Sequence, residues 1–457
     1  MSVVSTDLVR KYNVPGPRYT SYPTVPYWEA TPSAQQWIEH LAQSLSAGRA
    51  RGEGAAVYVH IPFCRSLCTY CGCNVRITRS RSFVAPYLAA VLEEFRMYRE
   101  RLGITALPVG ELHIGGGTPT YLSAAELAEL VDGLLAGMTL ASEAVLSLEV
   151  DPRTTDADQL RVLAQRGFRR VSLGVQDFDP RVQDIVNRVQ SEEQVATVTE
   201  TARACGFESV NYDLIYGLPL QTLASIERTL DAVERLRPDR IAFYSYAHVP
   251  WIRPSQRRFT EADLPTGAER RALYELGRER LERAGYREVG LDHFALPTDS
   301  LWRALESGTL HRNFMGYTDT FTVPLVGLGL SAIGDAVTAF AQNEKELNRY
   351  QERVLSGELP LHRGHLLDRE DQILRQHILN LMTRFHTEWR SPGAQTPFLD
   401  SVHQRLGPLA ADEVVELADG SCRVTEPGRA FVRNVCMAFD ARLMRRAPTT
   451  ALFSSTV

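Results

Sequence analysis

The sequence predicts an α/β protein with three parts: an N-terminal extended arm, an incomplete six-stranded (β/α) barrel of the TIM type, and a small, mainly helical, winged-helix-like C-terminal domain. Strand-like and helix-like segments alternate from residue 55 to about residue 260, which predicts parallel strands covered by helices. Each predicted strand also ends in chemically capable residues, as at the mouth of a barrel. A doubly wound sheet, the alternative, would gather such residues at one switch point.

Six segments have the composition of barrel strands: "AAVYVHIPF", "GELHIGGG", "AVLSLEVDP", "RRVSLGVQDF", "SVNYDLIYGLP" and "RIAFYSYAHVP". Segments between them, such as "SAAELAELVDGLLAGM", have apolar residues at helical spacing, here with Ser123 as the expected N-cap. The strand ends carry four cysteines, then "GGGTP", and then Glu149, Gln176, Asp213 and His248. These residues are therefore expected to share one mouth.

The flanking segments predict further parts of the fold. "KYNVPGPRYTSYPTVPYW" is rich in proline and tyrosine and predicts an extended arm. "REVGLDHFAL" predicts one more strand, and "HRNFMGYTD" with "VGLGLSAIGD" a glycine-rich connection. A break is expected near residues 357–364, followed by a helix and by a hairpin turning at Asp419-Gly420. The expected divisions are 1–54 (arm and helix), 55–360 (barrel with extension) and 361–457 (C-terminal domain).

The composition limits the class of protein. Of 457 residues, 44% are hydrophobic and 23% charged, with a formal net charge of −5, so no global nucleic-acid or membrane footprint is expected. The N-terminus lacks the apolar core of a signal peptide, and no apolar run approaches the ~20 residues of a membrane span. The expected location is the cytoplasm, where thiols stay reduced.

Four of the seven cysteines lie within ten residues, in "HIPFCRSLCTYCGCN", with the spacing C-x3-C-x2-C-x-C. Disulfides fit poorly with an odd cysteine count in a reducing compartment. Structural zinc commonly takes two ligand pairs from separate segments, and no second C-x2-C or H-x3-H pair is present. A redox pair would leave two of the four unexplained. A [4Fe–4S] cluster held by three thiolates, with one iron left open, suits the spacing of Cys64, Cys68 and Cys71.

The cysteine loop after the first strand, followed by "GGGTP" after the second, resembles the radical S-adenosylmethionine (SAM) family. Flanking motifs narrow the resemblance to the oxygen-independent coproporphyrinogen III oxidase family. They are "PGPRYTSYPT", "LEVDPR", "GVQDF", "DLIYGLP", "YAHVP", "HRNF.GYT" and "GLGLSAI". The likeness runs from about Pro15 to Leu443. Met315 departs from it, because a known member of that family has glutamine there, and the segment 319–325 lacks an expected carboxylate after Asp319.

The resemblance implies a set of site residues. Cys64, Cys68 and Cys71 would hold the cluster, and Cys73 would be a catalytic or structural accessory. The candidate catalytic residues are Cys73, Glu149 and Arg188. One SAM molecule would contact Tyr58, Tyr70, Gly116, Glu149 and Ile333. A second would contact Gly117, Thr118, Gln176, Arg188, Asp213 and Ala247.

Each of these roles has a simpler alternative. The glycines of "GGGTP" permit a tight turn, and a lone carboxylate such as Glu149 is usually solvated. Arg188 suits a ligand carboxylate and Asp213 a ligand ammonium, but the two residues can also form a plain salt bridge at the barrel rim.

The activity implied is the oxygen-independent oxidative decarboxylation of coproporphyrinogen III to protoporphyrinogen IX in haem biosynthesis, by a 5′-deoxyadenosyl radical from SAM. The implied partners are this substrate and a low-potential electron donor protein, with no nucleic acid and a monomeric state. One alternative is another radical SAM enzyme, or a haem chaperone, acting on a different tetrapyrrole. The Gly72-Cys73 pair and the N-terminal arm argue against it. Another is nucleic-acid binding by the C-terminal domain, whose arginines are too few for a phosphate footprint.

Overall fold

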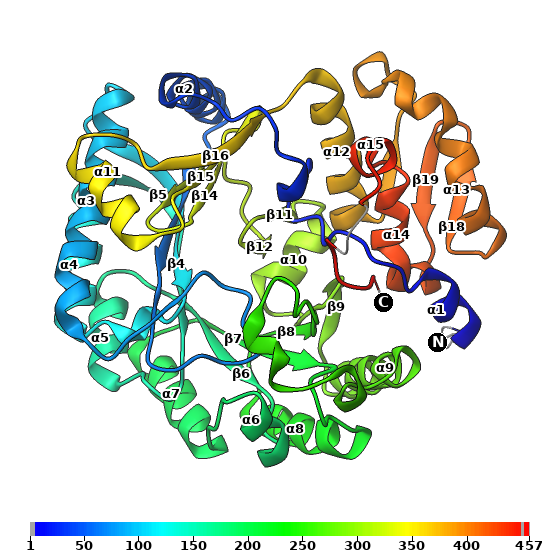
Figure 1. Cartoon of the computed structure of the whole chain (residues 1–457), viewed down its shortest axis with the longest axis horizontal. Coiled ribbons are helices and arrows are strands. Elements are labelled where there is room, and N and C mark those ends of the chain that lie inside the picture. Colours follow the sequence, from blue (N-terminus) through cyan, green and yellow to red (C-terminus); the bar gives the residue numbers. More distant parts are fainter. Residues whose placement is uncertain (1–4, 449–451, 457) are drawn as a thin grey trace.

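The computed structural model describes residues 5–448 and 452–456. Its centre is one twelve-stranded sheet in which six parallel strands follow one another in chain order (Figure 1). These strands are β1 (Ala55–Ile61), β4 (Leu107–Gly116), β5 (Met138–Val150), β6 (Arg170–Gln176), β7 (Ser209–Tyr216) and β8 (Arg240–Ser245). The predicted barrel strands are therefore all present. The sheet does not close on itself, which makes the barrel incomplete, as predicted.

Helices cover the outer face of this sheet, on the left and lower sides of Figure 1. They are α3 (Val84–Arg101), α4 (Ala124–Leu135), α5 (Ala157–Gln165), α6 (Pro180–Ile185), α7 (Glu192–Cys205), α8 (Leu223–Leu236) and α9 (Gly267–Arg283). In α4 the predicted N-cap is confirmed, because the Ser123 side chain accepts a hydrogen bond from the Glu126 N–H. The apolar stripes of the helices and the strand side chains form the largest buried core.

Two parts of the extension differ from the prediction. "REVGLDHFAL" forms two antiparallel strands, β9 (Arg287–Gly290) and β10 (His293–Ala295), because the chain reverses at Leu291, whose φ is 47°. The glycine-rich connection contains β13 (Leu325–Leu328), which pairs in parallel with β1, and β14 (Ile333–Asp335). Such strands are hard to recognise in a sequence, because their apolar runs are short and broken by glycine and their pairing partners are distant in the chain.

The sheet continues through β15 (Ala339–Asn343) and β16 (Leu361–Leu366), which pair as antiparallel neighbours. Strand pairing thus runs across the expected break near residues 357–364, and the exact division between barrel and C-terminal domain stays a prediction. The remaining elements of the extension are the helices α10 (Ser300–Ser307) and α11 (Leu347–Leu355) and the hairpin β11 (His311–Asn313) and β12 (Gly316–Thr318).

The C-terminal part combines helices with a three-stranded sheet in the order β17-β19-β18. The predicted hairpin is present, with Asp419-Gly420 between β18 and β19 and Gly420 at a φ of 65°. The elements are α12 (Arg369–Arg384), β17 (His386–Glu388), α13 (Val402–Ala411), β18 (Val415–Ala418), β19 (Ser421–Val424), α14 (Val432–Met437) and α15 (Ala441–Arg445).

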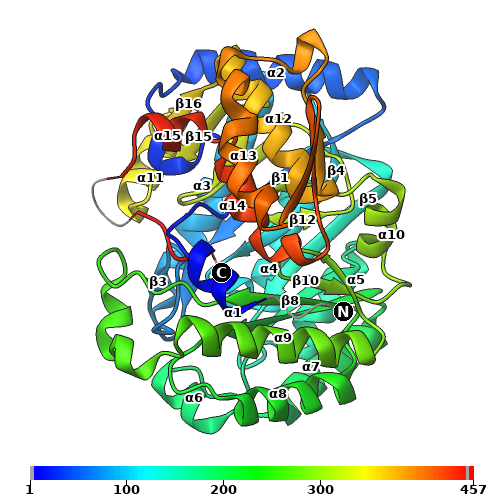
Figure 2. The same cartoon turned by 90° about the vertical axis from the view of Figure 1, so that its right-hand side faces the viewer.

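The N-terminal segment packs against this C-terminal part. Helix α1 (Thr6–Tyr12) and the extended arm after it lie beside α14 and α15, while α2 (Ala34–Ala50) lies over the far edge of the sheet (Figures 1 and 2). Tyr19 donates to the Asp440 carboxylate at 3.0 Å. The buried Arg433 guanidinium donates to carbonyls of Gly16 and Pro17. The arm therefore shares one apolar core with the C-terminal helices.

Candidate active site

The cysteine loop is held in place by a pair of short strands and by hydrogen bonds from side chains outside the loop. Short strands β2 (Phe63–Cys64) and β3 (Arg76–Ile77) pair in parallel and close the loop. His60, near the end of β1, contacts the Asn74 carbonyl through Nε2 at 2.9 Å and the Tyr58 hydroxyl through Nδ1 at 3.0 Å. The Asn187 side chain, just after α6, donates to the Leu67 carbonyl at 2.8 Å. These bonds hold the loop over the carboxyl ends of the barrel strands.

The four loop cysteines line one cavity of about 410 Å³, here called the cysteine cavity. Cys68 is buried, Cys64 and Cys71 are half-buried, and Cys73 is exposed. The cavity also receives the glycines after β4 and polar side chains from β5, β6, β7 and the α6–α7 connection. It brings together most of the predicted site: Tyr70, Gly116, Gly117, Thr118, Glu149, Gln176, Arg188 and Asp213.

The arrangement of the thiols fits a multi-iron cluster. Burial raises the pKa of the Cys64 thiol to about 11, and the nearby Cys71 and Cys68 add to the rise despite a contact with the Thr118 hydroxyl. Three thiolates this close repel one another unless a cationic group compensates them. Among the described residues, no three His, Cys, Asp or Glu side chains form a site for a single metal ion. Cys64, Cys68 and Cys71 line one cavity, and a cubane cluster takes its thiolate ligands from side chains that surround it.

A second cavity, of about 400 Å³, lies on the other side of Glu149 and is here called the β1 cavity. It is lined by Tyr58 and His60 from β1 and by Ile333 at the start of β14. Cys73, Gly116 and Glu149 line both cavities. Tyr70, grouped with Tyr58 by the resemblance, lies on the cysteine cavity instead. Ala247 lines neither; its carbonyl accepts a hydrogen bond from Gln256.

Glu149 stands at the boundary with its carboxylate held in a fixed direction. The Gly116 N–H donates to Oε2 at 2.9 Å, and His113 Nε2 lies 3.5 Å from Oε1. Burial raises the pKa of Glu149, but the hydrogen bonds and charge from His113 and Gly116 outweigh it and lower the pKa overall. The side chain remains 42% accessible. An ionised carboxylate facing both cavities can accept hydrogen bonds from a ligand hydroxyl or ammonium.

The alternative of an Arg188–Asp213 salt bridge is wrong. Arg188 pairs with Asp151 at 3.2 Å, donates to the Gly174 carbonyl at 2.5 Å and approaches Cys68 Sγ at 3.6 Å. The Asp213 carboxylate accepts from the Ser172 hydroxyl and the Asn211 amide. Burial and the negative charge of Glu149 raise the pKa of Asp213 to about 6. The guanidinium and the carboxylate therefore face the cysteine cavity as separate groups.

Sequence reasoning did not single out His113 and Arg153, which both contact site residues. His113 lies two residues after Glu111 on β4, and this two-residue period places both side chains on the inner face of the sheet. Arg153 lies three residues after the end of β5, in the motif "LEVDPR". The apolar Met315 lies in the turn of the β11–β12 hairpin and lines the β1 cavity.

Comparison with known proteins gives the same class as the fold and the cysteine loop. The Radical SAM superfamily matches residues 58–233, which cover β1 to α8. The fold and this match define a radical SAM protein with an incomplete barrel. Figure 1 shows the matched strands and helices from blue to green.

Full-length relatives define the family. The oxygen-independent coproporphyrinogen III oxidase of Pseudomonas aeruginosa is 41% identical over 96% of this chain and 95% of its own length. That of Escherichia coli K12 is 40% identical over 98% of both. The structure of coproporphyrinogen III oxidase from Escherichia coli, described as a radical SAM enzyme, superimposes with a TM-score of 0.87 at 39% identity, over 96% of this chain and 99% of that one. The chain belongs to the oxygen-independent coproporphyrinogen III oxidase family.

No helix in the described part of the chain combines the length and apolar character of a membrane span.

Proposed function

We propose that this chain is a radical SAM enzyme that converts coproporphyrinogen III to protoporphyrinogen IX without oxygen, by oxidative decarboxylation of two propionate side chains. The observation that carries the proposal is the cysteine cavity, which sets three cysteines beside the glycine turn after β4 and Glu149 at the mouth of an incomplete barrel. The relatives that match nearly the whole chain bear the name of this activity.

The cofactors are a [4Fe–4S] cluster, held by Cys64, Cys68 and Cys71, and SAM. When bound together and reduced, they supply the 5′-deoxyadenosyl radical that removes a hydrogen atom from the substrate. The protein holds the reacting groups and keeps water away from them. Glu149 accepts hydrogen bonds from SAM, while Tyr58 and Ile333 form the wall against which it packs. Cys73 lines both the cysteine cavity and the β1 cavity.

Two SAM molecules are proposed, in line with the two cavities. The β1 cavity contains Tyr58 and Ile333 of the first predicted set, together with the shared Gly116 and Glu149. The cysteine cavity contains five of the six residues predicted for the second: Gly117, Thr118, Gln176, Arg188 and Asp213. Each volume lies in the range of small-molecule sites, about 300–1,000 Å³. A reaction with two hydrogen abstractions has a use for two molecules.

Four further properties of the protein stay predictions. A low-potential electron donor protein, a monomeric state and a cytoplasmic location all fit an enzyme that needs one-electron reduction in a reducing compartment. Residues 361–457 are proposed as a domain that covers the substrate rather than binds nucleic acid.

The proposed function is tested by anaerobic reconstitution with iron and sulfide, followed by incubation with SAM, a chemical reductant and coproporphyrinogen III. Mass analysis is expected to show a product lighter by two carboxyl groups and two hydrogens, with 5′-deoxyadenosine released. A reconstituted protein that forms 5′-deoxyadenosine but leaves coproporphyrinogen III unchanged, while converting another tetrapyrrole, would favour the alternative substrate.

Gly116→Ala is expected to weaken binding of the first SAM molecule. Gly116 has a φ of 113°, and an added Cβ would lie 2.4 Å from the Nδ1 atom of His60, whose ring is held on both sides. Overpacking of this kind costs about 1–3 kcal/mol. If this cost reduces the free energy of SAM binding, the affinity falls roughly 5- to 150-fold. Equilibrium dialysis with SAM measures the change. Gly407→Ala, where an added Cβ meets nothing within 4 Å, is the matched control.

A further inference from the structure

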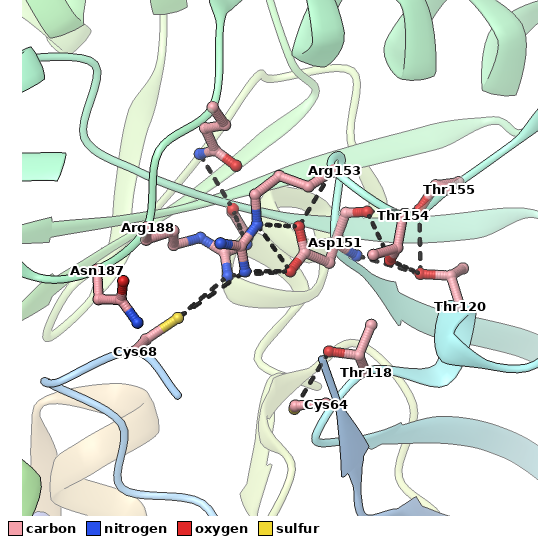
Figure 3. A network of polar contacts seen from close by, with 12 residues as sticks. Cys64, Cys68, Thr118, Thr120, Asp151, Arg153, Thr154, Thr155, Asn187 and Arg188 are labelled. Atoms are coloured by element: carbon pink, nitrogen blue, oxygen red, sulfur yellow. Dashed lines mark hydrogen bonds and ion pairs between the residues drawn. The ribbon is translucent and has the colours of Figure 1, made fainter. Parts of the chain in front are cut away.

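Asp151 lies directly after β5 and holds two guanidinium groups beside the cysteine loop (Figure 3). Arg153 donates two hydrogen bonds to its carboxylate, from Nε to Oδ1 at 3.0 Å and from Nη2 to Oδ2 at 2.7 Å. Arg188 donates from Nη1 to the same Oδ2 at 3.2 Å. Burial raises the pKa of Asp151, but the charges of Arg188 and Arg153 lower it overall, so the carboxylate is ionised at neutral pH.

Both guanidinium groups also approach the sulfur of one cysteine. Arg188 Nη1 lies 3.6 Å and Arg153 Nη2 3.9 Å from Cys68 Sγ. Figure 3 shows the two groups side by side, between the Asp151 carboxylate and the sulfur. Cys68 is the most buried of the four loop cysteines, and the side chains of Arg188 and Asp151 are 9% and 8% exposed. Water therefore screens these contacts poorly.

The three charged groups sum to one positive charge beside Cys68. Asp151 neutralises only one of the two guanidiniums, and no second carboxylate pairs with either in the described chain. Arg188 has a proposed role toward the second SAM molecule, whereas Arg153 has none. Its side chain nevertheless lines the cysteine cavity. A buried cation that donates N–H groups to a cluster sulfur is one of the features that set the potential of an iron–sulfur cluster.

We propose that Arg153, oriented by Asp151 and acting with Arg188, raises the reduction potential of the cluster through N–H···S contacts at Cys68. The inference rests on the proposed function, since it requires the three-cysteine cluster. The step concerned is the addition of one electron to the cluster from an external low-potential donor, with no bond broken and no proton moved. Because that electron makes the cluster more negative, the nearby positive charge stabilises the reduced form more than the oxidised form.

Two substitutions at this triad are expected to shift the potential in opposite directions. Arg153→Gln removes a positive charge, so the equilibrium constant for reduction should fall about tenfold, which for one electron is 59 mV. Asp151→Asn keeps the shape but removes the compensating negative charge, so the potential should rise. Arg153→Lys keeps the charge but loses the bidentate hydrogen bonds to Asp151, so its reduction potential should lie between those of Arg153→Gln and the unmodified protein. Arg161→Gln, on the exposed face of α5 beside Asp158, is the control and should shift nothing.

The measurement is a redox titration of the anaerobically reconstituted full chain, followed by electron paramagnetic resonance, with iron and sulfide counted in each variant. Opposite shifts at equal cluster content support the proposal. Unchanged potentials, or shifts of the same sign in Arg153→Gln and Asp151→Asn, overturn it and leave the triad as a tether for the turn after β5. If the unmodified protein holds no cluster, the proposed function itself fails. If instead Arg153→Lys keeps its cluster but has the potential of Arg153→Gln, charge is not the cause, and the inference is rejected while the proposed function stands.

Discussion

Cys64→Ala is expected to reduce reconstituted iron and sulfide to background and to abolish protoporphyrinogen formation. Cys64 is one of three cysteines around the cysteine cavity, and a cluster with one open iron has no spare thiolate ligand. Cys68→Ala and Cys71→Ala should behave in the same way. Iron and sulfide analysis after anaerobic reconstitution measures the loss, and circular dichroism checks that the fold survives.

Cys73→Ala is the matched control within the same loop. Cys73 is exposed and lies between the two cavities, and its thiol interacts with Cys71, whose pKa it lowers. Its loss should leave cluster content near normal while turnover falls. A Cys73→Ala protein as poor in iron as Cys64→Ala would mean that the cluster has four cysteine ligands, and the three-cysteine assignment would be wrong.

Asp213→Ala is expected to lower SAM binding from two equivalents toward one and to stop the completion of both decarboxylations. Asp213 lines the cysteine cavity on a strand remote from the loop, so the cluster content should stay normal. Loss of a hydrogen bond to a charged group costs about 1.5–3 kcal/mol, so affinity at the second site should fall roughly 10- to 150-fold. Titration calorimetry of the reconstituted protein measures both the stoichiometry and the affinity.

The pH dependence of this binding provides an independent check. Burial and the charge of Glu149 raise the pKa of Asp213 to about 6. An ammonium group is held only by the ionised carboxylate, so second-site affinity should be full above about pH 7 and fall as the pH drops through 6. Asp213→Asn should remove this dependence. If the unmodified protein binds one equivalent at every pH and still completes both decarboxylations, the second site does not exist.

The sequence was sufficient for the parts of the fold that depend on local pattern. Continuous apolar runs such as "AAVYVHI" are typical of strands buried on both faces, and their alternation with amphipathic helices predicts parallel pairing. The strands of the extension were harder to predict from the sequence. Strand β13 has one glycine among its four residues and no turn signal of its own, and its pairing with β1 joins residues about 270 positions apart. No local sequence pattern indicates which strand will be the partner.

The candidate site likewise has one part that the sequence determines and another that depends on the tertiary structure. The spacing of Cys64, Cys68 and Cys71 determines by itself that three thiols lie on one short loop, because covalent connectivity alone keeps them together. Which charges surround that loop is decided by strands that meet only in the folded chain. Arg188 therefore pairs with Asp151 rather than Asp213, and Arg153 reaches Cys68 from 85 residues away. Electrostatic contacts between distant residues leave no periodic trace in a sequence, so only the tertiary structure determined them.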